Sequence, residues 1–493
     1  MDTMNRARLS RRMLLGASVA SAATLAVSRN RFPAGATRRA VQATPVAADR
    51  EALFAELEAF IERQMTELKV PGVAVGIVDG DREHTAGFGV TNLDHPLPVD
   101  TDTLFQIGST TKTVTATATM RLVEQGKLDL EAPVRQYLPK FWVADDAVSA
   151  QVRVRHLLTH SSGWYGDDFT DTGDGDDALT RYVEEMADLP QLFPLGRFFS
   201  YNNAAVDALG RVIEVVTGQT YEAAAHDLVL APLGMDASFY FAEEIMTREF
   251  AVGHSAPPDD PLGTPATVTP WAIPRASNPP GGVISSIVDQ LRYARFHLGD
   301  GSLEGKQLLR PETMRRMQEP MGPGGSLGMD VLDGIGALWL LSTVDGARVV
   351  AHGGSTYGQQ SAFVLVPERG FGVTVLTNAD SGALLGEEVS KWALDRFLGM
   401  RQEPPVTRPI SATALPDYAG EYDFGQDQRV VVEDGGDGLT LSVTGLDSDL
   451  DWVGDDRFLA TLQGMPMLVD FERNDAGHVA WVRISGRMSA RVP

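Results

Sequence analysis

Ser109 and Lys112 stand three positions apart at the end of the stretch Phe-Gln-Ile-Gly-Ser-Thr-Thr-Lys. A serine hydroxyl is a weak nucleophile unless a base takes its proton, and a lysine can be that base only where burial or nearby cations lower its pKa. If a helix begins at Ser109, the two side chains share one face, and the free N–H groups of the first turn suit a developing oxyanion. The same spacing also arises by chance, with a capping serine and a solvated lysine. The pair therefore indicates acyl transfer only where other residues agree.

Two other groups of residues agree with this chemistry. A tyrosine at position 201 could relay protons, and the amide of Asn203 could hold a substrate carbonyl. A bland interpretation of this segment is a turn with a buried tyrosine. Late in the chain, glycines allow the backbone to approach a ligand closely, and the N–H of Ser355 is a candidate oxyanion donor, in the run His352, Gly353, Gly354 and Ser355.

The elements that must position these residues follow from hydrophobic periodicity. An amphipathic helix is expected over 52–68, and a long, mostly helical block over 109–298, with helices that end at Gly126 and Gly218. A closing helix is expected over 383–398. Runs of strand-forming residues predict strands at 73–78, 84–90, 335–342, 347–351, 361–367 and 372–377.

This order predicts one antiparallel sheet made of early and late strands, because short turns join antiparallel neighbours. The two terminal helices would cover one face of the sheet. The helical block would form a second lobe, with a cleft between the lobes. The fold class is α/β in the α+β sense.

The C-terminal part of the chain has a different composition. Four prolines mark residues 401–416 as a linker, and residues 417–493 alternate between short apolar runs and Gly/Asp turns. Strands are expected at 430–432, 439–443, 467–471 and 479–484. The sequence predicts a small all-β domain that could bind a polymer, cover the cleft or add stability, and nothing in it looks catalytic.

Taken together, Ser109-x-x-Lys112, Tyr201-x-Asn203 and His352-x-Gly354 resemble the serine β-lactamase and penicillin-binding protein superfamily. The resemblance is strongest to the class C β-lactamase-like branch, which includes esterases, D-aminopeptidases and D-Ala-D-Ala carboxypeptidases. It runs from about 52 to 398 and includes the stretches 156–163, 232–235, 280–286 and 308–312. It implies a β-lactamase/transpeptidase-like fold within a domain at 44–400.

The resemblance also implies roles for individual residues. Ser109 would become acylated, while Lys112 and Tyr201 share the proton traffic. Asn203 would bind the substrate amide or orient Lys112. The N–H groups of Ser109 and Ser355 would form the oxyanion hole, and the remaining substrate contacts would come from His352, Gly353 and Gly354. Water would then hydrolyse the acyl-enzyme without a metal or cofactor.

One position departs from the pattern of true β-lactamases. Their Lys-Thr-Gly is His352-Gly353-Gly354 here, and a histidine with its ordinary pKa of roughly 6.5 is mostly neutral at pH 7. The loss of a permanent cation disfavours β-lactams and free carboxylates. Esters, amides or small peptides are the expected substrates. The alternatives are a peptidase for D-amino-acid peptides of the cell wall, a weak class C-type β-lactamase, and a penicillin-binding sensor without turnover.

Composition narrows the partners. The chain has 493 residues, no cysteine and a formal net charge of −24. The missing cysteines exclude disulfides and thiolate metal sites. The acidic surface disfavours nucleic acid and anionic membranes, so we expect a small-molecule or peptide substrate.

The first residues resemble an export signal. Arg11 and Arg12 precede an apolar run over 13–27 that is too short for an ordinary membrane span. Residues 1–43 are expected to be a twin-arginine signal peptide and leader, with cleavage near Ala43. This predicts a mature protein without a membrane span, in the periplasm or outside the cell.

Three other signals are weaker. Residues 324–328 match a nucleophile elbow but lack the strand–turn–helix context, so a loop is expected. A metal on His156 and His160 is disfavoured, because the glutamate of a zinc helix is missing. The six aspartates within 166–177 are expected to form a solvated rim that disfavours anionic substrates, rather than a calcium site.

Overall fold

A computed structural model of the chain describes residues 47–258, 260–426, 428–462 and 464–493. The expected leader at 1–43 lies outside these residues. The centre of the larger domain is an antiparallel seven-stranded sheet, in the order β12-β13-β14-β15-β16-β1-β2. Its strands are β1 (Gly72–Asp79), β2 (Arg82–Gly89), β12 (Gly334–Ile335), β13 (Leu340–Val344), β14 (Ala347–Ser355), β15 (Gln360–Val366) and β16 (Phe371–Thr377). Early and late strands therefore form one sheet, as the sequence predicts.

The sheet is covered on both faces, and β1 shows why its sequence is apolar throughout. Successive side chains of a strand point to opposite faces. Val73, Val75 and Ile77 join the core under the terminal helices α2 (Ala47–Leu68) and α13 (Gly382–Leu398). On the other face, a Cβ on Gly76 would lie 2.8 Å from Leu291 of α11 (Ile287–Leu298). The terminal helices share one face, as expected, and α11 covers the other.

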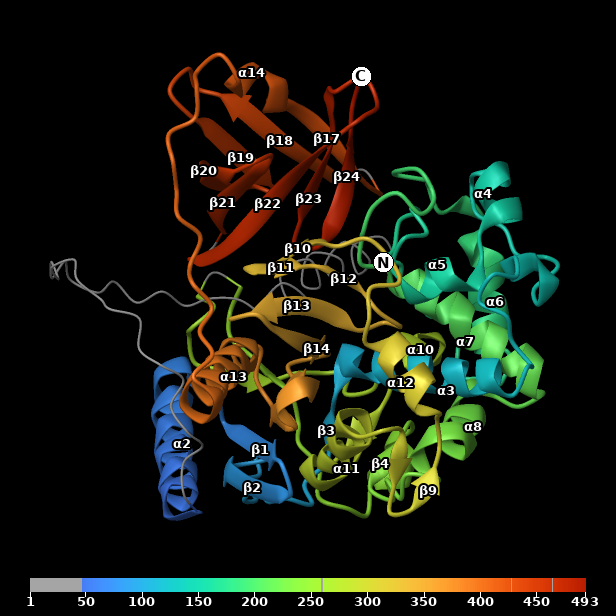
Figure 1. The fold of residues 1–493 in the computed structure, drawn as a ribbon, viewed down its shortest axis with the longest axis vertical. Coiled ribbons are helices and arrows are strands. Elements are labelled where there is room, and N and C mark those ends of the chain that lie inside the picture. The colour runs from blue at the N-terminus through green and yellow to red at the C-terminus, as the bar shows by residue number, and fades with distance from the viewer. Residues whose placement is uncertain (1–46, 259, 427, 463) are drawn as a thin grey trace, which may run out of the picture.

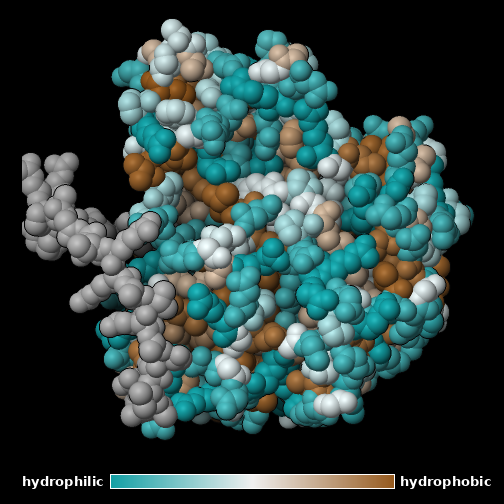
Figure 2. All heavy atoms as spheres, in the orientation of Figure 1, coloured by the Kyte–Doolittle hydropathy of each residue, from teal (hydrophilic) through white to brown (hydrophobic). Residues whose placement is uncertain are grey.

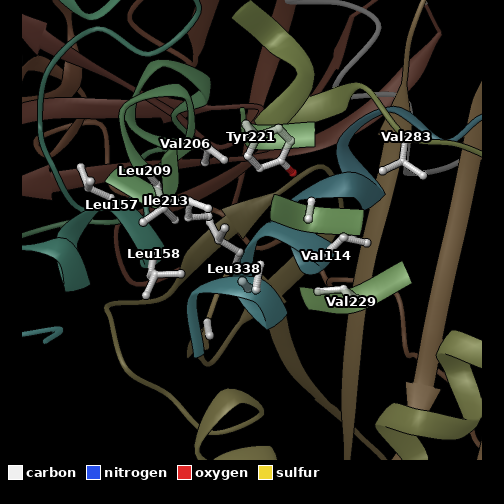
Figure 3. Close-up of a cluster of buried hydrophobic side chains, with 14 of the residues drawn as sticks. Val114, Leu157, Leu158, Val206, Leu209, Ile213, Tyr221, Val229, Val283 and Leu338 are labelled. Carbon is white, nitrogen blue, oxygen red and sulfur yellow. The ribbon is translucent and has the colours of Figure 1, made fainter. Parts of the chain in front are cut away.

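The helical lobe is built around α3 (Thr111–Glu124) and α7 (Asn203–Thr217), which lie at the right of Figure 1. Gly218 ends α7 with a φ of 71°, a left-handed conformation that glycine adopts without strain. Figure 3 shows the core of this lobe, which includes Val114, Leu157, Val206, Leu209 and Ile213. This core fixes the two helices that carry the candidate catalytic residues.

Shorter elements complete the larger domain. The helices are α4 (Asp146–Gln151), α5 (Val154–Leu158), α6 (Ala178–Glu185), α8 (Tyr221–Ala225), α9 (Ala242–Ile245), α10 (Asn278–Gly281) and α12 (Pro311–Met317). The strands are β3 (Phe105–Gln106), β4 (Ser238–Phe239), β5 (His254–Ser255), β6 (Ala266–Thr267), β7 (Ile284–Ser285), β8 (Ser302–Leu303), β9 (Lys306–Gln307), β10 (Gly325–Leu327) and β11 (Asp330–Leu332).

Two local expectations are wrong. The strand expected over 335–342 is split between β12 and β13, because Leu338 has a φ of 56° and turns the chain between them. The loop expected over 324–328 contains β10, which pairs with β11. β10 is followed by β11 and β11 by β12, with no helix between them, so this segment lacks the strand–turn–helix arrangement of a nucleophile elbow.

The C-terminal β domain is a closed eight-stranded barrel, at the top of Figure 1. It follows α14 (Leu415–Tyr418) and comprises β17 (Gly420–Gly425), β18 (Gln428–Asp434), β19 (Leu439–Val443), β20 (Leu446–Gly454), β21 (Arg457–Leu462), β22 (Met465–Arg473), β23 (Val479–Ile484) and β24 (Arg487–Arg491). Closure pairs β17 with β24 and leaves no free sheet edge. Large apolar side chains such as Tyr422, Phe458 and Phe471 form its core.

The barrel stands on the larger domain, and a shallow recess separates it from the helical lobe in Figure 2. Backbone hydrogen bonds cross between the domains, from Leu468 to the carbonyl of Gly328 at 2.9 Å. The indole of Trp481 donates to the carbonyl of Leu192 at 3.0 Å. Across the described ranges, none of the helices is both long and apolar enough to cross a membrane.

Candidate active site

Ser109 lies in a short 3-10 turn, Gly108–Thr110, that leads directly into α3. The chain enters this turn from β3, and Ser109 itself is only partly buried. Lys112 follows in the first turn of α3 and is fully buried. The α-helix thus begins at Thr111, two residues later than the expected start at Ser109, and the serine lies in the turn before it.

The Lys112 ammonium is held between two oxygens. Its Nζ lies 2.9 Å from Ser109 Oγ and 2.9 Å from the carbonyl oxygen of Pro280. Burial lowers the pKa of Lys112 to about 7 because a charged amine is poorly solvated there, although Asp207 and Asp167 oppose the shift. A substantial fraction of the neutral amine is then available near pH 7, at hydrogen-bonding distance from the hydroxyl.

The end of β14 passes directly over the Ser109 backbone. A Cβ on Gly354 would lie 1.9 Å from the Ile107 carbonyl oxygen and 2.8 Å from the Ser109 nitrogen. A Cβ on Gly108 would lie 2.6 Å from the Ser355 nitrogen. The two glycines allow this close approach, which brings the backbone amide groups of Ser109 and Ser355 near each other.

Tyr201 lies against the Ser109–Lys112 pair. The Lys112 Nζ is 4.9 Å from the centre of the Tyr201 ring. The ring of His160 stacks on the Tyr201 ring with 4.5 Å between their centres. Burial raises the pKa of the Tyr201 hydroxyl, and a hydrogen bond with Ser109 partly opposes that shift. The phenol therefore stays protonated at neutral pH, which suits a group that passes a proton on.

Asn203 begins α7, and its side chain has a defined partner. The Asn203 Nδ2 donates to Asp167 Oδ1 at 2.8 Å. The neighbouring Asn202 caps the helix by accepting from the backbone N–H of Ala205 at 2.7 Å. The local sequence thus fixes both the helix start and the orientation of the Asn203 amide.

His352 is buried on β14, and its ring centre is 6.0 Å from that of Tyr201. Burial lowers its pKa to about 3, and the nearby Lys112 lowers it further. Its Nδ1 lies 2.6 Å from the Gly353 carbonyl oxygen, which indicates that Nδ1 carries the proton. His352 is therefore neutral at pH 7 and supplies no cation at this position.

The acidic segment 166–177 differs from the expected solvated rim at its first two aspartates, since Asp167 is buried and Asp168 is half-buried. Asp171, Asp174, Asp176 and Asp177 are exposed, as expected. Asp167 is buried and forms an ion pair with Arg487 at 3.1 Å. The reason is tertiary: the first aspartate of the segment meets an arginine from the barrel.

The two histidines considered as a metal pair have other contacts. His156 Nδ1 accepts from the Arg153 backbone N–H at 3.0 Å. His160 Nδ1 accepts from the Asn202 N–H at 3.1 Å, and its ring stacks on Tyr201. Within the described ranges, no group of three or more His, Asp or Glu residues is arranged to hold a metal ion.

Three buried charged residues near the site were not found by sequence reasoning. They are Asp167, Asp207 and Arg487. Asp207 lies one helical turn after Asn203 and is fully buried, and this burial raises the pKa of its carboxyl group. Its position in α7 could have been noted from the i, i+4 spacing, whereas Asp167 and Arg487 are 320 positions apart and share no local signal.

An antiparallel sheet with a helical lobe, and a Ser–Lys pair at the start of a helix between them, defines a serine hydrolase of the penicillin-recognising type. The β-lactamase family model matches residues 57–394, so the chain belongs to the β-lactamase family. The barrel, which begins at β17, lies beyond the matched residues.

Individual relatives agree with this assignment. The chain is 35% identical over 367 residues to penicillin-binding protein 4 of Amycolatopsis lactamdurans, across 73% of this chain and 94% of that protein. It is 33% identical over 242 residues to esterase EstB of Burkholderia gladioli, across 46% of this chain and 61% of that protein. The crystal structure of SurE matches with a TM-score of 0.75 and 24% identity over 90% of this chain and 100% of that one, which shows a shared fold.

Proposed function

We propose that this serine hydrolase acts on esters, amides or small peptides through an acyl-enzyme formed on Ser109. The observation that carries the proposal is the 2.9 Å contact between Ser109 Oγ and the buried Nζ of Lys112. A base at hydrogen-bonding distance with a pKa near the working pH is what a serine nucleophile requires. No metal or cofactor takes part in the proposed reaction.

The proposed reaction has two halves. Neutral Lys112 accepts the proton as Ser109 Oγ bonds to the substrate carbonyl carbon, and the N–H groups of Ser109 and Ser355 stabilise the oxyanion. Tyr201 and Lys112 return the proton to the leaving alcohol or amine as its bond to carbon breaks. Water then attacks the acyl-enzyme with the same groups as base and acid, and the acid product leaves.

His352 supports a preference for neutral substrates. A buried, neutral imidazole replaces the cation that would attract a carboxylate at this position. The exposed aspartates at 171, 174, 176 and 177 would also repel an anion if they border the substrate's path. Esters and amides without a free carboxylate fit these charges better than β-lactams do.

The first test is a substrate panel on the purified protein with Ser109→Ala as its control. We expect wild-type protein to hydrolyse nitrophenyl esters, and the variant to lose activity by on the order of a million-fold, because it lacks the hydroxyl that would be acylated. Mass spectrometry should find the acyl group on the peptide that contains Ser109. Turnover retained by the variant would refute the nucleophile assignment.

A second candidate function is covalent penicillin binding without fast turnover. It is favoured by the 35% identity to a protein named penicillin-binding protein 4 over 94% of that protein's length. The lifetime of the adduct decides between the two functions. A β-lactam adduct that persists for hours, in a protein that does not hydrolyse esters, would identify a sensor. Release of the acyl group within seconds would identify an enzyme.

We also propose export by the twin-arginine route. The support is the Arg11–Arg12 pair before a short apolar run. Replacing both arginines by lysine in the full chain should leave the protein in the cytoplasm, as measured by cell fractionation. Equal amounts of both proteins outside the cytoplasm would contradict the proposed route.

A further inference from the structure

The hairpin between β23 and β24 of the barrel lies against the segment that carries Tyr201. Ser485 and Gly486 have φ values of 50° and 73°, as in a tight two-residue hairpin turn. The carbonyl of Gly486 accepts from the Tyr201 backbone N–H at 2.8 Å. On the next strand, the Met488 N–H donates to Ser200 Oγ at 3.1 Å. The hairpin tip is thus bonded to the backbone of the candidate active site.

Arg487 is the first residue after this turn, and only 5% of it is exposed. Its guanidinium carbon lies 4.7 Å from the centre of the Tyr201 ring. Its Nε is 3.1 Å from Asp167 Oδ2, and its Nη1 donates to the Ser485 carbonyl at 2.9 Å. The Arg487 guanidinium is therefore fixed by hydrogen bonds from both Nε and Nη1, and it lies against the ring of Tyr201.

Asp167 extends this contact to a second site residue. Its Oδ1 accepts from the Asn203 amide at 2.8 Å, so Arg487, Asp167 and Asn203 form one buried polar chain. Tyr201 and Asn203 are also fixed by backbone bonds, to Gly486 and to Gly166 respectively. The barrel therefore contacts the side chain of Tyr201 directly and that of Asn203 through one carboxylate.

We propose that Arg487 is a positioning residue of the active site. It holds Tyr201 directly, and Asn203 through Asp167, against the Ser109–Lys112 pair. The barrel then contributes a residue that the active site needs, in addition to any effect on stability. This inference rests on the proposed function, because it assigns Tyr201 to proton transfer. The physical basis is that a planar guanidinium can pair with a carboxylate and stack on an aromatic ring at once.

The charges around Lys112 supply a readout of this role. Burial is the largest cause of its lowered pKa, Asp207 and Asp167 raise it, and Arg487 lowers it. The other titratable groups that face Lys112 are Tyr201, whose pKa burial raises, and His160 and His352, whose pKa values burial lowers, so all three are neutral. Loss of the Arg487 cation therefore raises the pKa of Lys112.

The experiment compares Arg487→Met, Arg487→Lys and the double variant Asp167→Asn with Arg487→Met. Arg429→Met is the matched control, because Arg429 is a half-exposed arginine on the same barrel, 3.7 Å from Asp423. Rates are measured with one neutral and one carboxylate-bearing nitrophenyl ester and are divided by the concentration of acylatable Ser109. The double variant leaves no buried unpaired carboxylate, so it keeps the test valid if Arg487→Met folds poorly.

We expect kcat for both esters to fall by on the order of 100-fold in Arg487→Met, with KM little changed, because a small displacement of Tyr201 impairs proton transfer. The acid limb of the pH–rate profile should move to higher pH. The double variant should keep the low kcat but regain the wild-type limb, since both charges are gone. Arg487→Lys should be intermediate, because it keeps the charge without the planar fork.

Three results would overturn the proposal. An unchanged kcat per acylatable site would mean that Arg487 only stabilises the fold. A rise in KM confined to the carboxylate-bearing ester would mean that Arg487 binds a substrate anion. A fall equal to that of Arg429→Met would show a general effect of barrel substitutions.

A separate measurement distinguishes this failure from failure of the proposed function. The chain has only six lysines, so Lys112 can be assigned by 13C NMR of labelled lysine with a Lys112→Met comparison. An upward shift of its titration in Arg487→Met supports the coupling even if no ester is hydrolysed. An unshifted titration contradicts the coupling even if the wild-type protein is an active esterase.

Discussion

At the scale of single residues, the site works because burial changes the basicity of Lys112. An exposed lysine is protonated at neutral pH and cannot accept the serine proton. Here, among the described residues, the ammonium donates to the Ser109 hydroxyl and the Pro280 carbonyl alone, and burial lowers its pKa to about 7. The same burial raises the pKa of Tyr201. One environment thus yields a neutral base and a protonated acid side by side.

This pairing predicts the pH dependence of acylation. Because Lys112 must be neutral to act as base, the rate should rise as pH increases through about 7 and then level off. Tyr201 should not limit the rate below pH 10, since its pKa is raised. Single-turnover acylation by a neutral nitrophenyl ester measures the profile, and Ser109→Ala supplies the background. A midpoint near the ordinary lysine pKa would contradict the role of burial.

The same residues show what a sequence can and cannot reveal about a site. Ser109 and Lys112 could be placed together because three-residue spacing at a helix start is a local rule. Asp167 was expected in solvent, since an aspartate-rich loop is usually exposed. Its partner Arg487 comes from another domain, 320 positions away, and charge pairing at such a distance has no local pattern. The roles of Asp167 and Arg487 were missed because they depend on the packing of two domains.

At the scale of elements, the approach of β14 to the turn before α3 decides the site geometry. Gly354 has no room for a side chain, whereas a Cβ on Gly353 would meet only the Ser361 carbonyl at an ordinary 3.4 Å. Ser361 on β15 fixes the approach, because its Oγ donates to the Ile107 carbonyl at 2.7 Å. β14 and the turn before α3 are thus held so close together that only a residue without a side chain fits at Gly354.

The two adjacent glycines provide a matched pair of substitutions. Gly354→Ala should push β14 away from Ser109, lower stability by about 1–3 kcal/mol and reduce acylation by on the order of 100-fold. Gly353→Ala should unfold at nearly the wild-type temperature, because its methyl group meets no backbone closer than van der Waals contact. Thermal unfolding and single-turnover acylation check both. Equal Tm values for the two variants would show that the close approach is not essential.

Strand prediction succeeded where burial on both faces leaves a clear apolar run. β1 is buried at seven of its eight positions, and its sequence has no charge before Asp79. Prediction was wrong at 335–342, because the turn at Leu338 uses a positive φ that is uncommon for a leucine, and the single glycine of this connection, Gly336, is a weak turn signal within an apolar run. The register and the closure of the barrel follow from pairings between strands, which periodicity alone does not contain.

At the scale of the whole molecule, the family match ends at residue 394, yet the barrel shares buried contacts with the matched domain. Arg483 is 1% exposed, pairs with Asp470 and Glu472 of β22, and donates from Nε to the Phe199 carbonyl at 3.0 Å. Asp470 in turn accepts from the Ser326 N–H at 2.7 Å. A buried polar network therefore spans the interface two residues from Tyr201.

This network predicts that the two domains unfold together. Calorimetry of the wild-type protein should show one transition, and Arg483→Met should separate it into two while lowering the stability of the interface by about 3 kcal/mol, because Glu472 loses its partner and the Phe199 carbonyl its donor. Arg429→Met, on the exposed barrel surface, should change stability by less than about 0.5 kcal/mol. Activity followed on the same heating ramp should disappear with the first transition of Arg483→Met, because Tyr201 loses its support from the barrel before the larger domain melts. Two transitions in the wild-type protein, with activity lost only in the second, would mean that the barrel is not needed for the active conformation.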